Sequence, residues 1–346
     1  MKIGIIGGGF YGCYLAKHLS KNNKVFLFEK NKKLIQESGK INQYRLHQGF
    51  HYPRSESTIK QTKEGFNNFF NEFKKFIYFP RYNFYCIHKN SHVDFASYLK
   101  IIKKNGLEYK IFNKTDIPFL KNEFIEGAVN TNEGVILIDK LNKSVQKEIK
   151  NKCYIKLNTN VIRANSFNGQ VETKNRLYSF DKIINTTYTN PNLGLSKKKF
   201  NIKYELAGIV IPELKIKNVP GITIMDGDHV SLYPRNKNSF SLTSVKYTPI
   251  KKFKSLNKIN YHLNNINNEE KKILKNRIYN HVNKYINLGD IKNSKDKFEI
   301  APKTKINDDQ GDVRTSEIIV ENKLISVLCG KLDTAPLIYK KILKII

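Results

Sequence analysis

The chain has 346 residues, 40% of them hydrophobic, so it can bury a full core and does not have a disordered composition. Its apolar runs are shorter than the roughly 20 residues of a membrane-spanning helix, and its N-terminus does not resemble a signal peptide, so we expect a cytoplasmic protein. Lys and Arg number 61 against 30 Asp and Glu, giving a formal charge of +31 that favours anionic partners.

The first thirty residues have the pattern of a buried strand, a glycine turn, a helix and a second strand. Gly7, Gly9 and Gly12 have the spacing of a dinucleotide-binding fingerprint, and the second strand ends at Glu29. Gly7 allows a tight turn, Gly9 leaves room for a pyrophosphate, and Gly12 lets the helix pack closely on the strand. Glu29 can accept hydrogen bonds from both ribose hydroxyls. The motif predicts a dinucleotide site but does not distinguish FAD from NAD.

The rest of the chain alternates between strand-like and helical patterns. A polar segment over residues 31–58 contains an unusual stretch, 44–55, with two arginines and two histidines. The lysine- and asparagine-rich residues 250–268 are the best candidate for a loop or linker. Strands are predicted at 82–89, 108–112, 128–137 (two strands and a turn), 153–157, 161–164, 176–180, 182–187, 200–248 (several strands) and 324–328, and helices at 58–76, 93–105, 139–150, 268–286 and after Gly330.

Four stretches together resemble the FAD-dependent oxidoreductases of the D-amino-acid oxidase superfamily, which includes glycine and sarcosine oxidases and 2-hydroxyacid dehydrogenases. They are Gly7–Gly12 with Glu29, Arg45–Ser55, Ile183–Thr187 and Ser326–Ala335. In this family the N-terminus of the C-terminal helix stabilises negative charge on the reduced flavin. Arg45–Ser55 replaces the serine- or glycine-rich segment that is usual after the first acidic residue, so the family's substrate does not carry over.

The resemblance implies an α/β fold, with a Rossmann-like FAD-binding domain and an inserted mixed-sheet substrate domain. We assign residues 1–80, 127–198 and 300–346 to the first domain and 81–126 and 199–299 to the second. The residues expected to bind FAD are Gly7, Gly9, Phe10, Tyr11, Gly12, Glu29, Lys30, Arg45, Val161, Thr186, Gly330, Lys331 and Leu332.

Oxidation of an amine or alcohol by flavin needs a group that takes a proton and an anchor for the rest of the substrate. His47 and His51 are candidates for the first role, because histidine titrates near working pH. Arg45 and Arg54 could hold flavin phosphate, flavin carbonyl oxygens or a substrate carboxylate, or could form ordinary loop ion pairs. Tyr52, in the same stretch, is a further candidate for binding substrate.

Later in the chain the candidates are more scattered. Tyr233 and Arg235 could line the substrate face or form an exposed turn, and Arg314 is a candidate carboxylate anchor. By resemblance to sarcosine-oxidase-like members, Lys246 is a candidate for promoting the reaction of oxygen with reduced flavin. Cys329 would lie beside the flavin, where a buried thiol is a simpler interpretation than a covalent link. The four cysteines include no C-x-x-C pair, and no metal site is predicted.

The leading hypothesis is an FAD-dependent oxidoreductase. It would remove a hydride from a C–N or C–OH carbon of a small anionic substrate, such as an amino acid, a hydroxy acid or a sugar derivative. One alternative is a flavin-dependent isomerase similar to UDP-galactopyranose mutase, and another is a flavoprotein that acts on or binds nucleic acid. The high charge suits the last, but lysines spread through every segment, with abundant Asn and Ile, are typical of compositional bias. The electron acceptor stays open.

Overall fold

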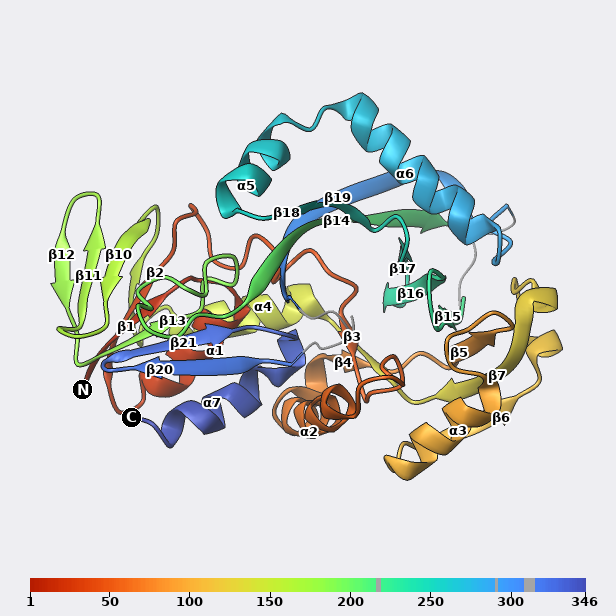
Figure 1. The fold of residues 1–346 in the computed structure, drawn as a ribbon, viewed down its shortest axis with the longest axis horizontal. Helices are drawn as coiled ribbons and strands as arrows, with labels where there is room; N and C mark the ends of the chain where they lie inside the picture. Colours follow the sequence, from red (N-terminus) through yellow and green to blue (C-terminus); the bar gives the residue numbers. More distant parts are fainter. Residues whose placement is uncertain (216–218, 290–291, 308–314) are drawn as a thin grey trace.

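The computed structural model describes residues 1–215, 219–289, 292–307 and 315–346. Within these residues a six-stranded sheet and a nine-stranded sheet dominate the fold. Figure 1 shows the two sheets toward opposite ends of the molecule, connected by the long strands β14 (Ile202–Leu214) and β19 (Lys292–Ile306). The two long strands pair antiparallel along most of their length.

The six-stranded sheet has the order β20-β21-β13-β1-β2-β9 and is parallel except for the edge pair β20–β21. Strands from both ends of the chain therefore meet in one sheet, which is the expected α/β arrangement. The strands are β1 (Lys2–Ile6), β2 (Lys24–Phe28), β9 (Tyr154–Lys156), β13 (Lys182–Asn185), β20 (Glu317–Glu321) and β21 (Leu324–Leu328).

Both faces of this sheet are covered, as the near-continuous apolar strands require. Ile5, Leu27 and Ile184 point to the face that packs on the helices, in one buried cluster. Ile6 and Ile183 point to the opposite face and pack in another cluster with the small sheet β10–β12. This alternation between neighbours along each strand follows the two-residue period of β structure.

The nine-stranded sheet has the order β18-β14-β17-β16-β15-β5-β7-β6, with β19 added beside β14. Its remaining strands are β5 (Asn83–His88), β6 (Tyr109–Phe112), β7 (Ile125–Thr131), β15 (Gly221–Met225), β16 (Val230–Asn236), β17 (Ser239–Ser244) and β18 (Pro249–Phe253). Two three-stranded sheets contain β10 (Val161–Asn165), β11 (Gln170–Thr173) and β12 (Leu177–Ser179), and β3 (Arg45–Leu46), β8 (Gly134–Ile136) and β4 (Ile77–Tyr78).

The helices pack mainly around the parallel sheet, with α6 over the large sheet (Figure 1). None of those in the described part of the chain combines the length and apolarity needed to cross a bilayer. The α-helices are α1 (Phe10–Leu19), α2 (Glu56–Phe73), α3 (Phe95–Lys104), α4 (Ile138–Ile149), α5 (Leu256–Asn265), α6 (Asn268–Asn283) and α7 (Ala335–Leu343), and the 3₁₀ turns are η1 (Lys74–Phe76), η2 (Lys114–Asp116), η3 (Asn122–Phe124) and η4 (Leu332–Thr334).

One prediction about secondary structure is wrong. Residues 250–268, expected to be a loop, contain most of β18 and the helix α5. Their apolar residues Ile250, Phe253 and Ile259 pack in one cluster with Leu206 of β14, so tertiary contacts outweigh a polar composition. The predicted domain boundaries before 127 and 300 fall inside β7 and β19, and the domain division stays a prediction.

The contact between α1 and α2 includes a partly buried network of hydrogen bonds whose contribution to stability can be tested. Glu72 of α2 lies 2.8 Å from His18 Nε2 and 3.1 Å from Lys17 Nζ, and it accepts a hydrogen bond of 2.5 Å from Tyr14. Burial alone would raise the pKa of Glu72, but the hydrogen bonds from His18, Tyr14 and Lys17 outweigh it and lower that pKa to about 2.

Because the folded pKa lies below the unfolded one, the stabilisation is complete above pH ~4.3 and is lost as the pH falls toward 2. We expect Glu72→Gln to lower the free energy of unfolding by about 1–3 kcal/mol at pH 7 and by much less at pH 3. Urea unfolding at both pH values measures this, with Glu64→Gln on the exposed face of α2 as the control. An equal effect at both pH values would contradict the assignment.

Candidate functional site

A cavity of about 860 Å³ lies beside the carboxyl ends of β1 and β2, where ligands bind in open α/β sheets. It is one continuous space, lined by residues from the N-terminal motif, from the segment after β2 and from the C-terminal turn. The expected FAD-binding residues in its wall are Gly7, Gly9, Phe10, Tyr11, Glu29, Lys30, Arg45, Val161, Thr186, Gly330, Lys331 and Leu332.

The glycine turn forms the cradle that the fingerprint predicts. Gly7 has φ +100°, and a Cβ there would lie 2.9 Å from the Thr186 carbonyl oxygen. A Cβ on Gly12 would lie 1.9 Å from the Gly7 carbonyl oxygen, so Gly12 is outside the lining but is needed for close packing. A Cβ on Gly9 would meet nothing within 4 Å. The open space over Gly9, at the N-terminus of α1, fits a pyrophosphate approaching the backbone.

Glu29 lies at the end of β2 and is only 7% exposed. Its two oxygens accept the backbone N–H groups of Gly8 and Asn31, each at 2.8 Å. Each carboxylate oxygen can accept a further bond, so ribose hydroxyls fit here. The neighbouring Lys30 lines the cavity and is paired with Glu37 at 2.8 Å.

Two hydroxyl groups fix the walls around the glycine turn. Thr186 Oγ1 donates to the carbonyl oxygens of Ile6 and Gly7, both at 3.0 Å. The Tyr11 hydroxyl lies 2.7 Å from Thr334 Oγ1 and also bonds the Lys331 carbonyl oxygen. Tyr11 thereby joins α1 to the C-terminal turn, so both termini of the chain shape the same cavity.

Arg45 occupies the wall on the side of the large sheet and is 6% exposed. Its guanidinium donates to the hydroxyls of Tyr85 (3.0 Å), Thr223 (3.0 Å) and Ser231 (2.8 Å). It also lies 3.8 Å from the ring centroid of Tyr233. These partners come from three strands of the large sheet, so Arg45 of β3 connects that sheet to the cavity.

His47, His51, Tyr52 and Lys331 line the cavity close to one another. The ring centroid of His47 lies 6.1 Å from that of His51 and 5.7 Å from that of Tyr52. Lys331 Nζ lies 3.9 Å from the ring centroid of Tyr52. Burial, with the positive charges of Lys331, Arg45 and His51, lowers the pKa of His47 well below its usual range. The His47 imidazole is therefore neutral at working pH.

Asp333, which the sequence did not single out, also lines this part of the cavity and is 1% exposed. Burial raises its pKa to about 6, although Lys331 and the His47 N–H oppose the shift. The carboxylate accepts a hydrogen bond from the backbone N–H of His47 at 3.3 Å. Its position could have marked it as a site residue, because it is an acid two positions after Lys331 and just before the final helix.

Four residues predicted to bind substrate or to act in catalysis do not line the cavity. Arg54 pairs with Asp226 at 2.5 Å, which is the loop ion pair given as its alternative. Lys246, the candidate for promoting the oxygen reaction, is exposed in the turn after β17, outside the cavity lining. Tyr233 and Arg235 are buried rather than in an exposed turn, Tyr233 under Arg45 and Arg235 against Tyr44. Arg314 lies outside the described residues.

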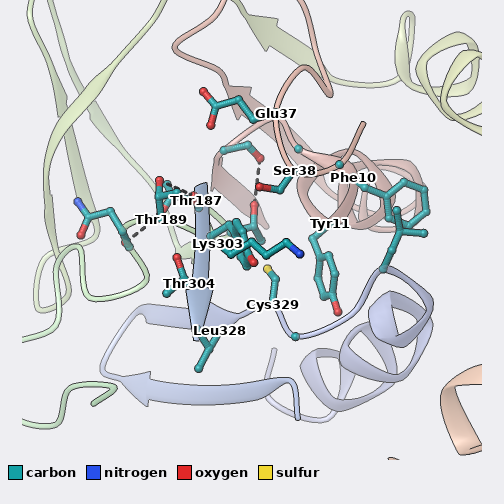
Figure 2. A pocket seen from close by; sticks show the side chains of 18 of the residues that line it. Phe10, Tyr11, Glu37, Ser38, Thr187, Thr189, Lys303, Thr304, Leu328 and Cys329 are labelled. Carbon is teal, nitrogen blue, oxygen red and sulfur yellow. Dashed lines mark hydrogen bonds between the residues drawn. The ribbon is translucent and has the colours of Figure 1, made fainter. Parts of the chain in front are cut away.

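The sequence also missed the part of the wall formed by β19. Lys303 and Thr304 come from this strand, and Ser38 donates a hydrogen bond of 2.7 Å to the Pro302 carbonyl oxygen. In Figure 2 Thr187 lies toward one side of the cavity and Tyr11 toward the other, with Lys303 between them. No motif marks β19, because its place depends on pairing with β14 about 100 residues earlier.

Comparison with known proteins shows the family. The model of a family described as FAD dependent oxidoreductase matches residues 2–293. The FAD-dependent monooxygenase FPY4 of Fusarium mangiferae is 24% identical over 355 residues, 99% of this chain and 90% of that protein. The FAD-dependent monooxygenase kojA of Aspergillus flavus is 27% identical over 198 residues, 55% of this chain and 46% of that protein.

Solved structures share the fold. Glycine oxidase from Geobacillus kaustophilus has a TM-score of 0.75 at 11% identity, covering 99% of this chain and 93% of that one. The dithionite-reduced L-alpha-glycerophosphate oxidase of Mycoplasma pneumoniae, with FAD bound, has a TM-score of 0.71 at 19% identity, covering 99% and 94%. The predicted fold class and the resemblance to the D-amino-acid oxidase superfamily are confirmed.

The residues present fit FAD, since the open space over Gly9 suits a pyrophosphate and Glu29 stands where a ribose is bound. The family match covers most of the chain and selects FAD, which the glycine motif alone did not distinguish from NAD. The chain belongs to the FAD-dependent oxidoreductase family and is an enzyme that uses FAD to oxidise a small molecule.

Proposed function

We propose that the enzyme oxidises a small anionic substrate at a C–N or C–OH carbon, with Arg45 as the group that binds the anion. FAD, when bound, supplies the acceptor for the hydride that leaves this carbon. The protein contributes the anchor for the substrate, the group that takes the proton from the amine or hydroxyl, and a wall that excludes water. The observation that carries the proposal is that Arg45 is buried in the cavity wall without an acidic hydrogen-bond partner.

Arg45 is a buried cation on the cavity wall whose direct hydrogen-bond partners are all neutral hydroxyls; the buried acid Glu133 lies beyond the Tyr85 hydroxyl and does not bond it directly. Its Nε–H is buried and has no hydrogen-bond partner among the described residues. Buried arginines are normally paired with an acid, because an unpaired charge in a low-dielectric interior is costly. A substrate carboxylate or similar anion would complete the hydrogen bonds of Arg45 and offset its charge.

His47 is the group best suited to accept the proton from the substrate amine or hydroxyl. It lines the cavity, it is neutral, and its Nδ1 is buried without a hydrogen-bond partner among the described residues. Because burial and the positive charges of Lys331 and Arg45 disfavour the imidazolium, a bound substrate anion would be needed to stabilise the proton that Nδ1 takes as the hydride leaves. Lys331, held by a 2.7 Å hydrogen bond to Thr62, adds positive charge that favours an anionic substrate.

The test is anaerobic reduction of the FAD-loaded enzyme by matched sets of amino acids, hydroxy acids and sugar derivatives. We expect bleaching of the flavin absorbance with acids and a slower reaction with the corresponding amides or esters, which lack the anion. Equal rates with charged and neutral partners would contradict the role of Arg45. A protein that takes up FAD but is bleached by no member of the sets would contradict the proposed substrate class.

Monooxygenation is the second candidate, because FPY4 is described as a monooxygenase and matches 99% of this chain. The two activities differ in where oxygen goes. A monooxygenase places one atom of labelled O₂ in the product, whereas an oxidase leaves both atoms outside the organic product. Mass spectrometry of the product formed under ¹⁸O₂ separates them.

A further inference from the structure

Two buried carboxylates hold two successive peptide groups of the cavity wall. Glu133 accepts the Gln48 N–H at 2.6 Å, and Asp333 accepts the adjacent His47 N–H at 3.3 Å. Glu133 comes from the turn between β7 and β8 and is 0% exposed. The segment that contains Arg45 and His47 is therefore held by acids from two distant parts of the chain.

Glu133 also reaches the guanidinium of Arg45 through one hydroxyl. The Tyr85 hydroxyl donates to Glu133 Oε2 at 2.6 Å and accepts from Arg45 NH1 at 3.0 Å. A phenol has only one hydrogen, so donation to Glu133 turns the oxygen lone pairs of Tyr85 toward Arg45. The carboxylate thus decides which way the Tyr85 hydroxyl points.

We propose that Glu133 is a positioning residue: it orients the Arg45 guanidinium toward the substrate anion through Tyr85, and it holds the His47–Gln48 peptide. This inference rests on the proposed function, because it takes Arg45 as the anion-binding group. Glu133 does not line the cavity, so it acts through these neighbours and not by touching substrate.

An amide cannot replace the carboxylate at this position. Glu133 receives two donors, the Gln48 N–H and the Tyr85 hydroxyl, on its two oxygens. A glutamine has one acceptor oxygen and one NH₂ group, so one of these donors would face another donor. If the NH₂ group faces Tyr85, the phenol hydrogen loses its acceptor and can turn toward Arg45, which breaks the orientation.

The experiment compares Glu133→Gln, Tyr85→Phe and the double variant, each loaded with FAD. Acetate is titrated as the anionic probe, and its binding is followed by the shift of the flavin visible absorbance. Each single variant is expected to weaken acetate binding about ten-fold, which is the scale of one hydrogen bond to a charged group. The double variant is expected to lose no more than the more weakly binding of the two single variants, because both changes break the same link.

Glu321→Gln is the matched control. Glu321 is also buried and accepts backbone N–H groups, from Ser196 and Lys197, but it does not line the cavity. This variant is expected to leave acetate binding unchanged. Glu133→Gln can also loosen the His47–Gln48 peptide. Tyr85→Phe leaves the hydrogen bond to that peptide in place, so it tests the link to Arg45 alone.

The outcomes separate the two proposals. If Arg45→Met loses acetate binding while Glu133→Gln and Tyr85→Phe bind as the unmodified enzyme does, the positioning role is overturned and the proposed function stands. Full additivity of the two single losses would also overturn the link through Tyr85. If Arg45→Met binds acetate normally, the proposed anion site fails first, and the role of Glu133 fails with it.

Discussion

Replacing Gly12 by alanine will abolish FAD retention and destabilise the fold. The new Cβ would lie 1.9 Å from the Gly7 carbonyl oxygen and 2.9 Å from Thr186 Oγ1, and the first of these is a backbone atom that cannot rotate away. The helix α1 would have to move off β1, which costs about 1–3 kcal/mol or more. The same movement carries the N-terminus of α1 away from the pyrophosphate. We expect FAD affinity to fall more than about 100-fold, an energy of about 2.7 kcal/mol.

Gly9→Ala is the informative partner to this variant. Its Cβ would meet no protein atom within 4 Å, so thermal unfolding of the FAD-free protein should be unchanged. The methyl group would occupy the space that we assign to the pyrophosphate, so FAD binding should still weaken. Fluorescence titration with FAD and thermal unfolding measure the two effects. If Gly9→Ala binds FAD normally, the pyrophosphate does not lie over Gly9.

The part of the site that was predictable from sequence is the part built by neighbours in the chain. The turn at Gly7–Gly12 and the acid at Glu29 belong to one βαβ unit, in which spacing alone brings the groups together. The segment 44–55 was recognised by its composition, and it does contribute Arg45, His47, His51 and Tyr52 to the cavity.

The rest depends on contacts between distant strands, which local patterns do not contain. Arg45 and Arg54 lie nine residues apart and look alike in sequence, yet one faces the cavity and the other pairs with Asp226. Lys246 was chosen from a weak resemblance in a lysine-rich chain, and its turn points to solvent. Asp333 and Glu133 were missed because nothing in the sequence says that they would be buried against neighbouring backbone N–H groups.

The second prediction concerns Arg45. Arg45→Met keeps much of the side-chain volume but removes the charge and every donor, so binding of an anionic substrate should weaken by about 2–4 kcal/mol, about 30- to 1,000-fold. The change also leaves the hydroxyls of Tyr85, Thr223 and Ser231 without their shared partner, which should lower the free energy of unfolding by about 1–3 kcal/mol. FAD affinity should change little, because the hydrogen bonds of Arg45 go to Tyr85, Thr223 and Ser231 and not to the glycine cradle or Glu29.

Arg45→Lys separates the contribution of the positive charge of Arg45 to substrate binding from that of its planar guanidinium. Lysine restores the positive charge but not the planar fork, and it cannot bond Tyr85, Thr223 and Ser231 together. We expect it to recover only part of the lost affinity, as measured by the substrate dependence of anaerobic flavin reduction. Arg277→Met, on the exposed surface of α6, removes the same charge far from the wall and should have no effect. If Arg277→Met weakens binding as much as Arg45→Met does, the overall positive field of the protein, and not a site at Arg45, attracts the substrate.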